Sequence, residues 1–90
     1  MDITDYRAMI DKVDDEIIRL FRRRMEIIEE LRLFKLEKGI AFENSRREEE
    51  IKERIADCLP ENLRTYAKVL YDSIFNISKD YMQHKTDFEQ

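Results

Sequence analysis

The stretch from Asp5 to Lys38, DYRAMIDKVDDEIIRLFRRRMEIIEELRLFKLEK, decides the fold of this chain. It contains neither glycine nor proline, and its apolar residues recur at steps of three and four, the spacing of one helix face. These residues are Ile10, Val13, Ile17, Leu20, Ile27, Ile28 and Leu31. The pattern predicts one helix over about residues 4–38, which is about 50 Å long at its usual rise per residue. A helix of that length extends beyond the core of a 90-residue monomer, which indicates a dimer or larger assembly.

Two cations fall inside this apolar stripe. At about 100° per residue, Arg24 and Lys35 share the direction of the stripe, whereas Arg7 lies to one side. A cation in a core stripe is costly unless it meets an anion, so we expect an anion that both can reach. The alternatives are a dipole position at the helix end for Lys35 and simple exposure for Arg7. On one helix Arg7 lies about 25 Å from Arg24, so it can approach that anion only from a second copy of the chain.

The next predicted element is a short helix. Gly39, the only glycine, stands where the first helix should end, and a short connection follows it. Ser45 and Glu48 have the spacing of a capping box. This spacing predicts a second helix over about residues 45–58, with Ser45 as its N-cap.

A third helix is predicted after Pro60, over about residues 61–84, with a frayed tail beyond it. Its expected core stripe has Ser78 and Met82 at the edge. The residues of that stripe are Leu63, Ala67, Leu70, Ile74, Ile77 and Tyr81. The sequence therefore predicts one all-α domain over residues 1–90, with three helices in the order long, short and long.

Composition excludes several classes of protein. The formal net charge of −4 argues against nucleic acid as a partner, because phosphate binding favours a basic face. No apolar run reaches the roughly 18–20 residues of a membrane span, and no signal peptide is recognisable. The single cysteine, Cys58, cannot form an internal disulfide, which favours the cytoplasm. One histidine and no metal-ligand spacing leave no support for a metal site or for a hydrolase of the serine or cysteine type.

Four segments carry an ordered set of polar residues. They are Arg7-Ala8-Met9-Ile10-Asp11-Lys12-Val13-Asp14, Arg22-Arg23-Arg24-Met25, Phe42-Glu43-Asn44-Ser45-Arg46-Arg47-Glu48-Glu49-Glu50 and Ile77-Ser78-Lys79-Asp80-Tyr81. Their order and spacing resemble the all-helical AroQ class of chorismate mutases over nearly the whole chain. The resemblance implies an intertwined homodimer with two equivalent sites. It also implies rearrangement of chorismate to prephenate in phenylalanine and tyrosine biosynthesis, without a metal or cofactor.

The resemblance assigns a role to each polar residue. Arg24 and the partner's Arg7 would hold the two carboxylates of chorismate. Lys35 would contact a carboxylate and the ether oxygen, and Glu48 would contact the ring hydroxyl. The loop backbone near Asn44 would help Glu48, and Arg47 and Ser78 would complete the polar wall.

Two positions depart from the family pattern. Asn44 stands where the family often has Asp. Met82 stands one turn after Ser78, where the family usually has Gln, sometimes Glu, as a second donor to the ether oxygen, and a thioether cannot donate. Gln83 is adjacent but is turned about 100° away on a regular helix. A shifted helix end that delivers Gln83, weakened activity and binding without turnover all stay open.

Two alternatives to the mutase therefore stay open as well. One is a related helical enzyme that cleaves isochorismate to pyruvate and salicylate. The other is a non-catalytic regulatory helical dimer with the same fold.

Overall fold

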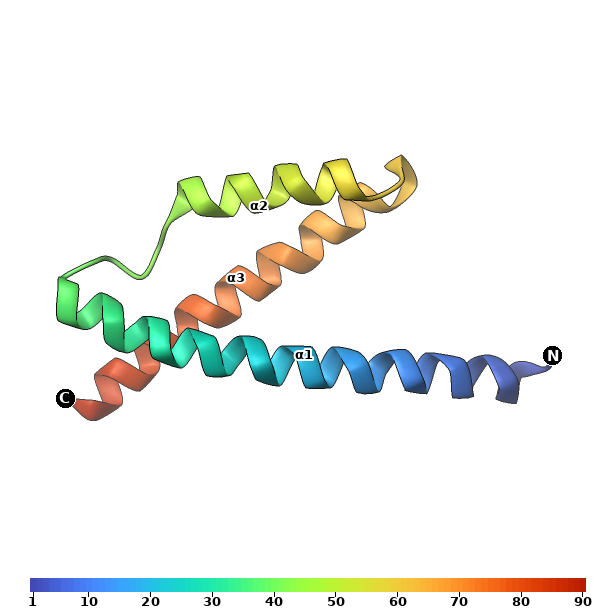
Figure 1. Ribbon diagram of the computed structural model, residues 1–90, viewed down its shortest axis with the longest axis horizontal. Helices are drawn as coiled ribbons and strands as arrows, with labels where there is room; N and C mark the ends of the chain where they lie inside the picture. Colours follow the sequence, from blue (N-terminus) through green and yellow to red (C-terminus); the bar gives the residue numbers. More distant parts are fainter.

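The computed structural model describes all 90 residues as three α-helices without strands. Helix α1 spans Ile3–Lys38, α2 spans Ser45–Cys58 and α3 spans Glu61–Glu89. The molecule is elongated, measuring 53 × 27 × 15 Å. Helix α3 runs back along α2 and then crosses the C-terminal half of α1, so that it contacts both (Figure 1). The prediction of an all-α chain with three helices is confirmed.

Local caps fix both ends of α1. The Asp2 carboxylate accepts a hydrogen bond from the Asp5 amide at 3.1 Å, and the Asp5 carboxylate accepts one from the Asp2 amide at 2.9 Å. Gly39 ends the helix, as the sequence predicts, with a left-handed φ of 67° that residues with a Cβ rarely adopt. The chain can therefore turn sharply from α1 into the connection.

The predicted cap of α2 is wrong by one residue. Asn44, not Ser45, is the N-cap, and its side-chain oxygen accepts a hydrogen bond from the Arg47 amide at 3.0 Å. Asparagine and serine are comparable caps. The Glu48 carboxylate binds Lys79 on α3, so it does not complete the capping box that the sequence suggests.

Helix α3 extends to Glu89, five residues beyond its predicted end, and there is no frayed tail over residues 85–89. The reason lies on α1. The Arg32 guanidinium donates to Thr86 Oγ1 at 3.2 Å and to both carboxylate oxygens of Glu89, at 2.8 and 2.9 Å. It also pairs with Glu29 at 2.6 Å. Arg32 is only 1% exposed, so this cluster fastens the last turns of α3 to α1.

The buried part of the chain is small and lies where α3 meets its neighbours. Seven residues are buried, namely Ile28, Arg32, Ile55, Phe75, Ser78, Met82 and Thr86. Ser78 and Met82 are thus in the middle of the packed face of α3, not at its edge, whereas Leu70 and Ile77 of the predicted stripe are exposed. The prediction that Ser78 and Met82 lie at the edge of the stripe is therefore wrong, because both pack inside the single chain.

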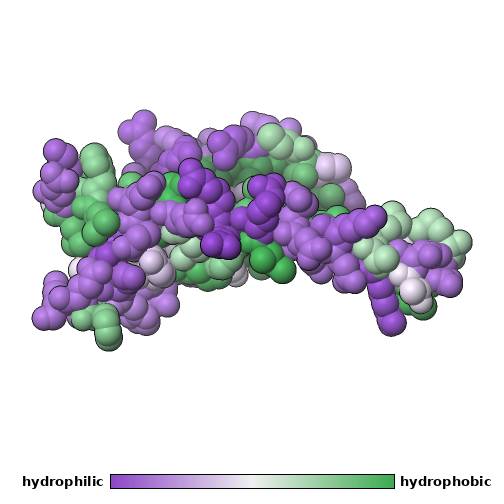
Figure 2. All heavy atoms as spheres, turned by 60° about the horizontal axis from the view of Figure 1, so that its bottom comes forward, coloured by the Kyte–Doolittle hydropathy of each residue, from purple (hydrophilic) through white to green (hydrophobic).

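The N-terminal part of α1 has no cover within the chain. Residues 3–23 are exposed throughout, and this segment extends away from α2 and α3 (Figure 1). Ile10 and Ile17, both in the predicted stripe, are each 57% exposed. Apolar side chains also reach the surface elsewhere along the molecule, among hydrophilic ones (Figure 2). None of the three helices combines the length and apolarity needed to cross a bilayer.

Candidate functional site

A cavity of about 320 Å³ lies among the three helices and the connection between α1 and α2. Its walls come from the C-terminal half of α1, the start of α2 and the middle of α3. Seven of the site residues predicted from the sequence line it, namely Arg24, Lys35, Asn44, Arg47, Glu48, Ser78 and Met82. The fold therefore collects in one place residues that are up to 58 positions apart in the chain.

Arg24 reaches the cavity from α1 and contacts α3. Its Nη1 donates a hydrogen bond to Ser78 Oγ, and the Ser78 hydroxyl donates to the Ile74 carbonyl at 2.9 Å. Burial lowers the pKa of Arg24, although the nearby Tyr71 acts in the opposite direction. An arginine still keeps its charge at any physiological pH. No carboxylate of the chain lies within ion-pair distance of Arg24, so its charge is free to meet an anion in the cavity.

Lys35 is the second cation of this kind. It is half-buried near the end of α1, and its ammonium donates to the Phe42 carbonyl of the connection at 3.0 Å. A carbonyl solvates the charge but does not neutralise it. Arg24 and Lys35 stand eleven residues apart, about 16 Å along the helix axis, and their long side chains can approach a small anion from both ends.

The start of α2 and the residue before it line the cavity with Asn44, Arg47 and Glu48. Glu48 Oε2 lies 3.3 Å from the Lys79 ammonium. Arg47 makes a 3.6 Å contact with Glu50 on the solvent side. The Asn44 side chain is used as the helix cap, so Asn44 shapes the wall by orienting the first turn of α2.

Lys79 is a residue of this site that the sequence did not single out. It lines the cavity and pairs with Glu43 of the connection at 3.2 Å as well as with Glu48. The sequence motif indicates its neighbour, Ser78, instead. Glu48 was the available signal, because a carboxylate that is largely buried in an otherwise cationic site needs a counter-ion.

Met82 lies one turn after Ser78 on α3, lines the cavity and is 2% exposed. Helix α3 is regular here, and Gln83 does not line the cavity. The Gln83 amide donates to Asp87 on the exposed surface at 2.8 Å. In this chain, then, the turn after Ser78 presents a thioether to the cavity and no hydrogen-bond donor.

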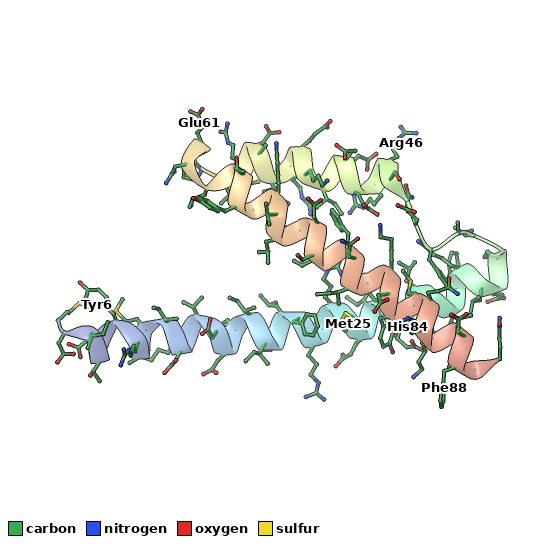
Figure 3. The ribbon with its side chains drawn as sticks, turned by 180° about the vertical axis from the view of Figure 1, so that it is seen from behind. Tyr6, Met25, Arg46, Glu61, His84 and Phe88 are labelled. Atoms are coloured by element: carbon green, nitrogen blue, oxygen red, sulfur yellow. The ribbon has the colours of Figure 1, made fainter.

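Arg7 lies far from these residues within one chain. It belongs to the exposed N-terminal part of α1, next to Tyr6 at the outer end of the helix (Figure 3). It does not line the cavity. Six predicted polar residues and Met82 are thus brought together, whereas Arg7 and Gln83 are not.

The assembled side chains suit anion binding and orientation. The cavity lining contains four cations and one carboxylate, which are Arg24, Lys35, Arg47, Lys79 and Glu48. It contains neither Cys58 nor His84, so it presents no thiolate or imidazole. No group of three or more His, Cys, Asp or Glu side chains is placed to hold a metal ion. Such a site can hold a small polyanion in a fixed shape.

Comparison with protein-family models matches residues 6–83 to the family described as chorismate mutase type II. Neither the curated proteins nor the solved structures gave a significant match. The matched segment runs from the residue before Arg7 to Gln83, and so contains every site residue predicted from the sequence. The resemblance drawn from the polar residues is confirmed, and the chain belongs to the chorismate mutase type II family.

Proposed function

We propose that this protein is a cytoplasmic chorismate mutase of phenylalanine and tyrosine biosynthesis, which rearranges chorismate to prephenate. The observation that carries the proposal is the pair Arg24 and Lys35, two cations that line the cavity and bond to the Ser78 hydroxyl and the Phe42 carbonyl, not to a carboxylate. Chorismate carries two carboxylates and would supply the missing anions. Because the chain belongs to the chorismate mutase type II family, we propose chorismate in preference to other small anions.

The proposed chemistry needs only what the cavity offers. The rearrangement is unimolecular, so the site must hold the substrate in a compact shape and needs no nucleophile or proton transfer. Negative charge develops on the breaking ether oxygen, and a fixed cation such as Lys35 stabilises that charge more in the transition state than in the ground state. One donor of this kind is worth about 3–4 kcal/mol. Arg24 holds a carboxylate, and Glu48 accepts a hydrogen bond from the ring hydroxyl.

The proposed working form is a homodimer. The stripe on the first half of α1, with Ile10, Val13, Ile17 and Leu20 each more than half exposed, is covered by a second copy in this arrangement. Packing two such helices antiparallel to each other also brings the partner's Arg7 toward the cavity. Each site is then built from both chains.

Mixing two inactive variants tests this shared site. We expect Arg7→Ala and Arg24→Ala each to be inactive alone. A mixed dimer keeps one complete site, because one chain supplies Arg24 and the other supplies Arg7. After unfolding and joint refolding, an equal mixture should recover about a quarter of the wild-type activity, from the statistics of symmetric dimers. No recovery from mixtures whose mixed dimers are verified by mass spectrometry would contradict the shared site.

The reaction itself is tested by mixing the protein with chorismate, following the loss of its ultraviolet absorbance and identifying the product. Prephenate formed at an enzymic rate supports the proposal. Tight binding without turnover would favour a second candidate, a non-catalytic dimer, for which Met82 in the cavity wall is the specific observation. Salicylate and pyruvate from isochorismate, with no prephenate from chorismate, would favour the lyase.

Met82→Gln should raise the rate of the mutase reaction. The new amide would stand at the cavity wall, where Met82 now lies, and could donate to the ether oxygen. We expect roughly a tenfold increase in kcat, which is less than the roughly hundredfold or more that one fully preorganised donor contributes. The matched control Met82→Leu keeps the volume without a donor and should not raise kcat. A rate that is unchanged or lower in Met82→Gln would contradict this expectation. Gln83→Ala would then test whether Gln83, which lies outside the cavity in the single chain, supplies the donor instead.

A further inference from the structure

Lys79 links three parts of the chain at the edge of the cavity. It extends from α3 and places its ammonium 3.2 Å from Glu43 Oε1 on the connection and 3.3 Å from Glu48 Oε2 on α2. Its side chain is only 26% exposed. The same residue lines both the cavity and a hollow of about 550 Å³ that shares Lys35 and Phe42 with it. Lys79 therefore forms part of the wall between the two spaces.

The ammonium of Lys79 offsets the negative charge of Glu48 at the cavity wall. Glu48 is the only carboxylate among the residues that line the cavity. An unpaired carboxylate there would repel a dianionic ligand and would be free to change its rotamer. Burial alone lowers the pKa of Lys79, but its bonds to Glu43 and Glu48 outweigh burial and raise that pKa. The ammonium is therefore charged at neutral pH and offsets the charge of Glu48.

We propose that Lys79 is a positioning residue, which holds the Glu48 carboxylate at the cavity wall and fastens the connection to α3. This inference rests on the proposed function for the role of Glu48 toward a substrate hydroxyl. Lys79 acts through Glu48 and does not need to touch the reacting atoms. Without it, Glu48 is misplaced and brings an uncompensated negative charge to the anion site.

The chain offers a matched control in Lys52. Its ammonium also links α2 to α3, at 2.6 Å from Asp72 and 3.8 Å from Glu49, and its side chain is 24% exposed. Lys52 does not line the cavity. A merely structural role for Lys79 predicts that Lys52→Ala and Lys79→Ala behave alike.

Kinetics with chorismate and hydrogen exchange together decide the question. We expect Lys79→Ala to lower kcat by roughly tenfold to a hundredfold, as for a misplaced catalytic group, and to raise KM severalfold, whereas Lys52→Ala leaves both unchanged. Lys79→Arg keeps the charge and should recover most of the loss. Combined with Glu48→Gln, Lys79→Ala should have little further effect, because the two residues act as a unit.

Hydrogen exchange of the amides in residues 40–48 gives a readout that does not need turnover. These amides should exchange faster in Lys79→Ala than in the wild type and should be unchanged in Lys52→Ala. Equal exchange and equal kinetics in the two variants would overturn the inference. A wild-type protein that does not convert chorismate would overturn the proposed function instead, and the exchange comparison would still decide whether Lys79 holds the connection and α2.

Discussion

Arg24→Ala should abolish turnover while leaving the folded protein at least as stable as the wild type. The reason is the environment of Arg24, which is half-buried, bonded to Ser78 and free of any carboxylate. Removing it eliminates the free-energy cost of desolvating a cation and breaks no ion pair. In the proposed site it removes the group that holds a substrate carboxylate, so we expect kcat/KM to fall by roughly a thousandfold, the effect of losing a buried charged partner.

Two measurements check this expectation. Chorismate kinetics give the loss of activity, and denaturant unfolding gives the free energy of unfolding. Arg24→Lys is the matched control: it keeps the charge but loses the planar fork, so part of the activity should return. A variant Arg24→Ala that loses activity and folding together would point to a structural role for Arg24.

Arg32→Ala should produce the largest loss of stability of any single change considered for this chain. Arg32 is buried like a core residue, yet it carries charge and donates to Glu29, Thr86 and Glu89. Replacing it with alanine leaves the carboxylates of Glu29 and Glu89 without their partner and opens a void where the guanidinium lay. Because both carboxylates keep some contact with solvent, we expect a loss of about 2–3 kcal/mol in the free energy of unfolding. Denaturant unfolding at pH 7 measures it.

The pH dependence of unfolding identifies the ion pair as the cause. The hydrogen bond from Arg32 is the main reason that the pKa of Glu29 is lowered in the folded chain. A depressed carboxylate pKa contributes stability that is complete above the unfolded value, about 4.3 for glutamate, and is lost as pH falls through the folded value. The difference between wild type and Arg32→Ala should therefore shrink below about pH 4. A difference that stays constant to lower pH would assign the loss to packing alone.

The helices were predictable because their signals are local. Apolar residues at continuous steps of three and four, without glycine or proline, predict α1. Gly39 ends this helix because glycine readily adopts the left-handed backbone conformation. Pro60 separates α2 from α3 in the same way. Such signals need no knowledge of what lies elsewhere in the chain, so the number and type of elements follow from sequence.

The errors all come from contacts between elements. Ser45 was predicted as the cap of α2 because Glu48 has the spacing of a capping box, but the Glu48 carboxylate is held by Lys79 of α3 and Asn44 is the cap. The end of α3 was placed too early because apolar periodicity ignores the polar residues that bind Arg32. An ion pair between residues that are far apart in the chain produces no periodic pattern in a single sequence.

One pattern could have revealed part of this arrangement. Arg24 bonds Ser78 and Arg32 bonds Thr86, and both pairs are separated by 54 residues. An eight-residue step on α1 is thus matched by an eight-residue step on α3, and the two hydroxyls explain why the packed face of α3 contains polar residues. Of the candidate site, the residues within reach of Arg24 and Lys35 were identifiable from the family motifs, whereas Lys79 required the structure.

Under the proposed dimer, the small interior of a single chain has a consequence for how the protein responds to dilution. With seven buried residues and an uncovered half-helix, folding and association become one event governed by mass action. The midpoint of thermal unfolding should then rise with protein concentration, and specific activity should fall in highly dilute assays. The amount of protein made in the cell would itself set the fraction that works.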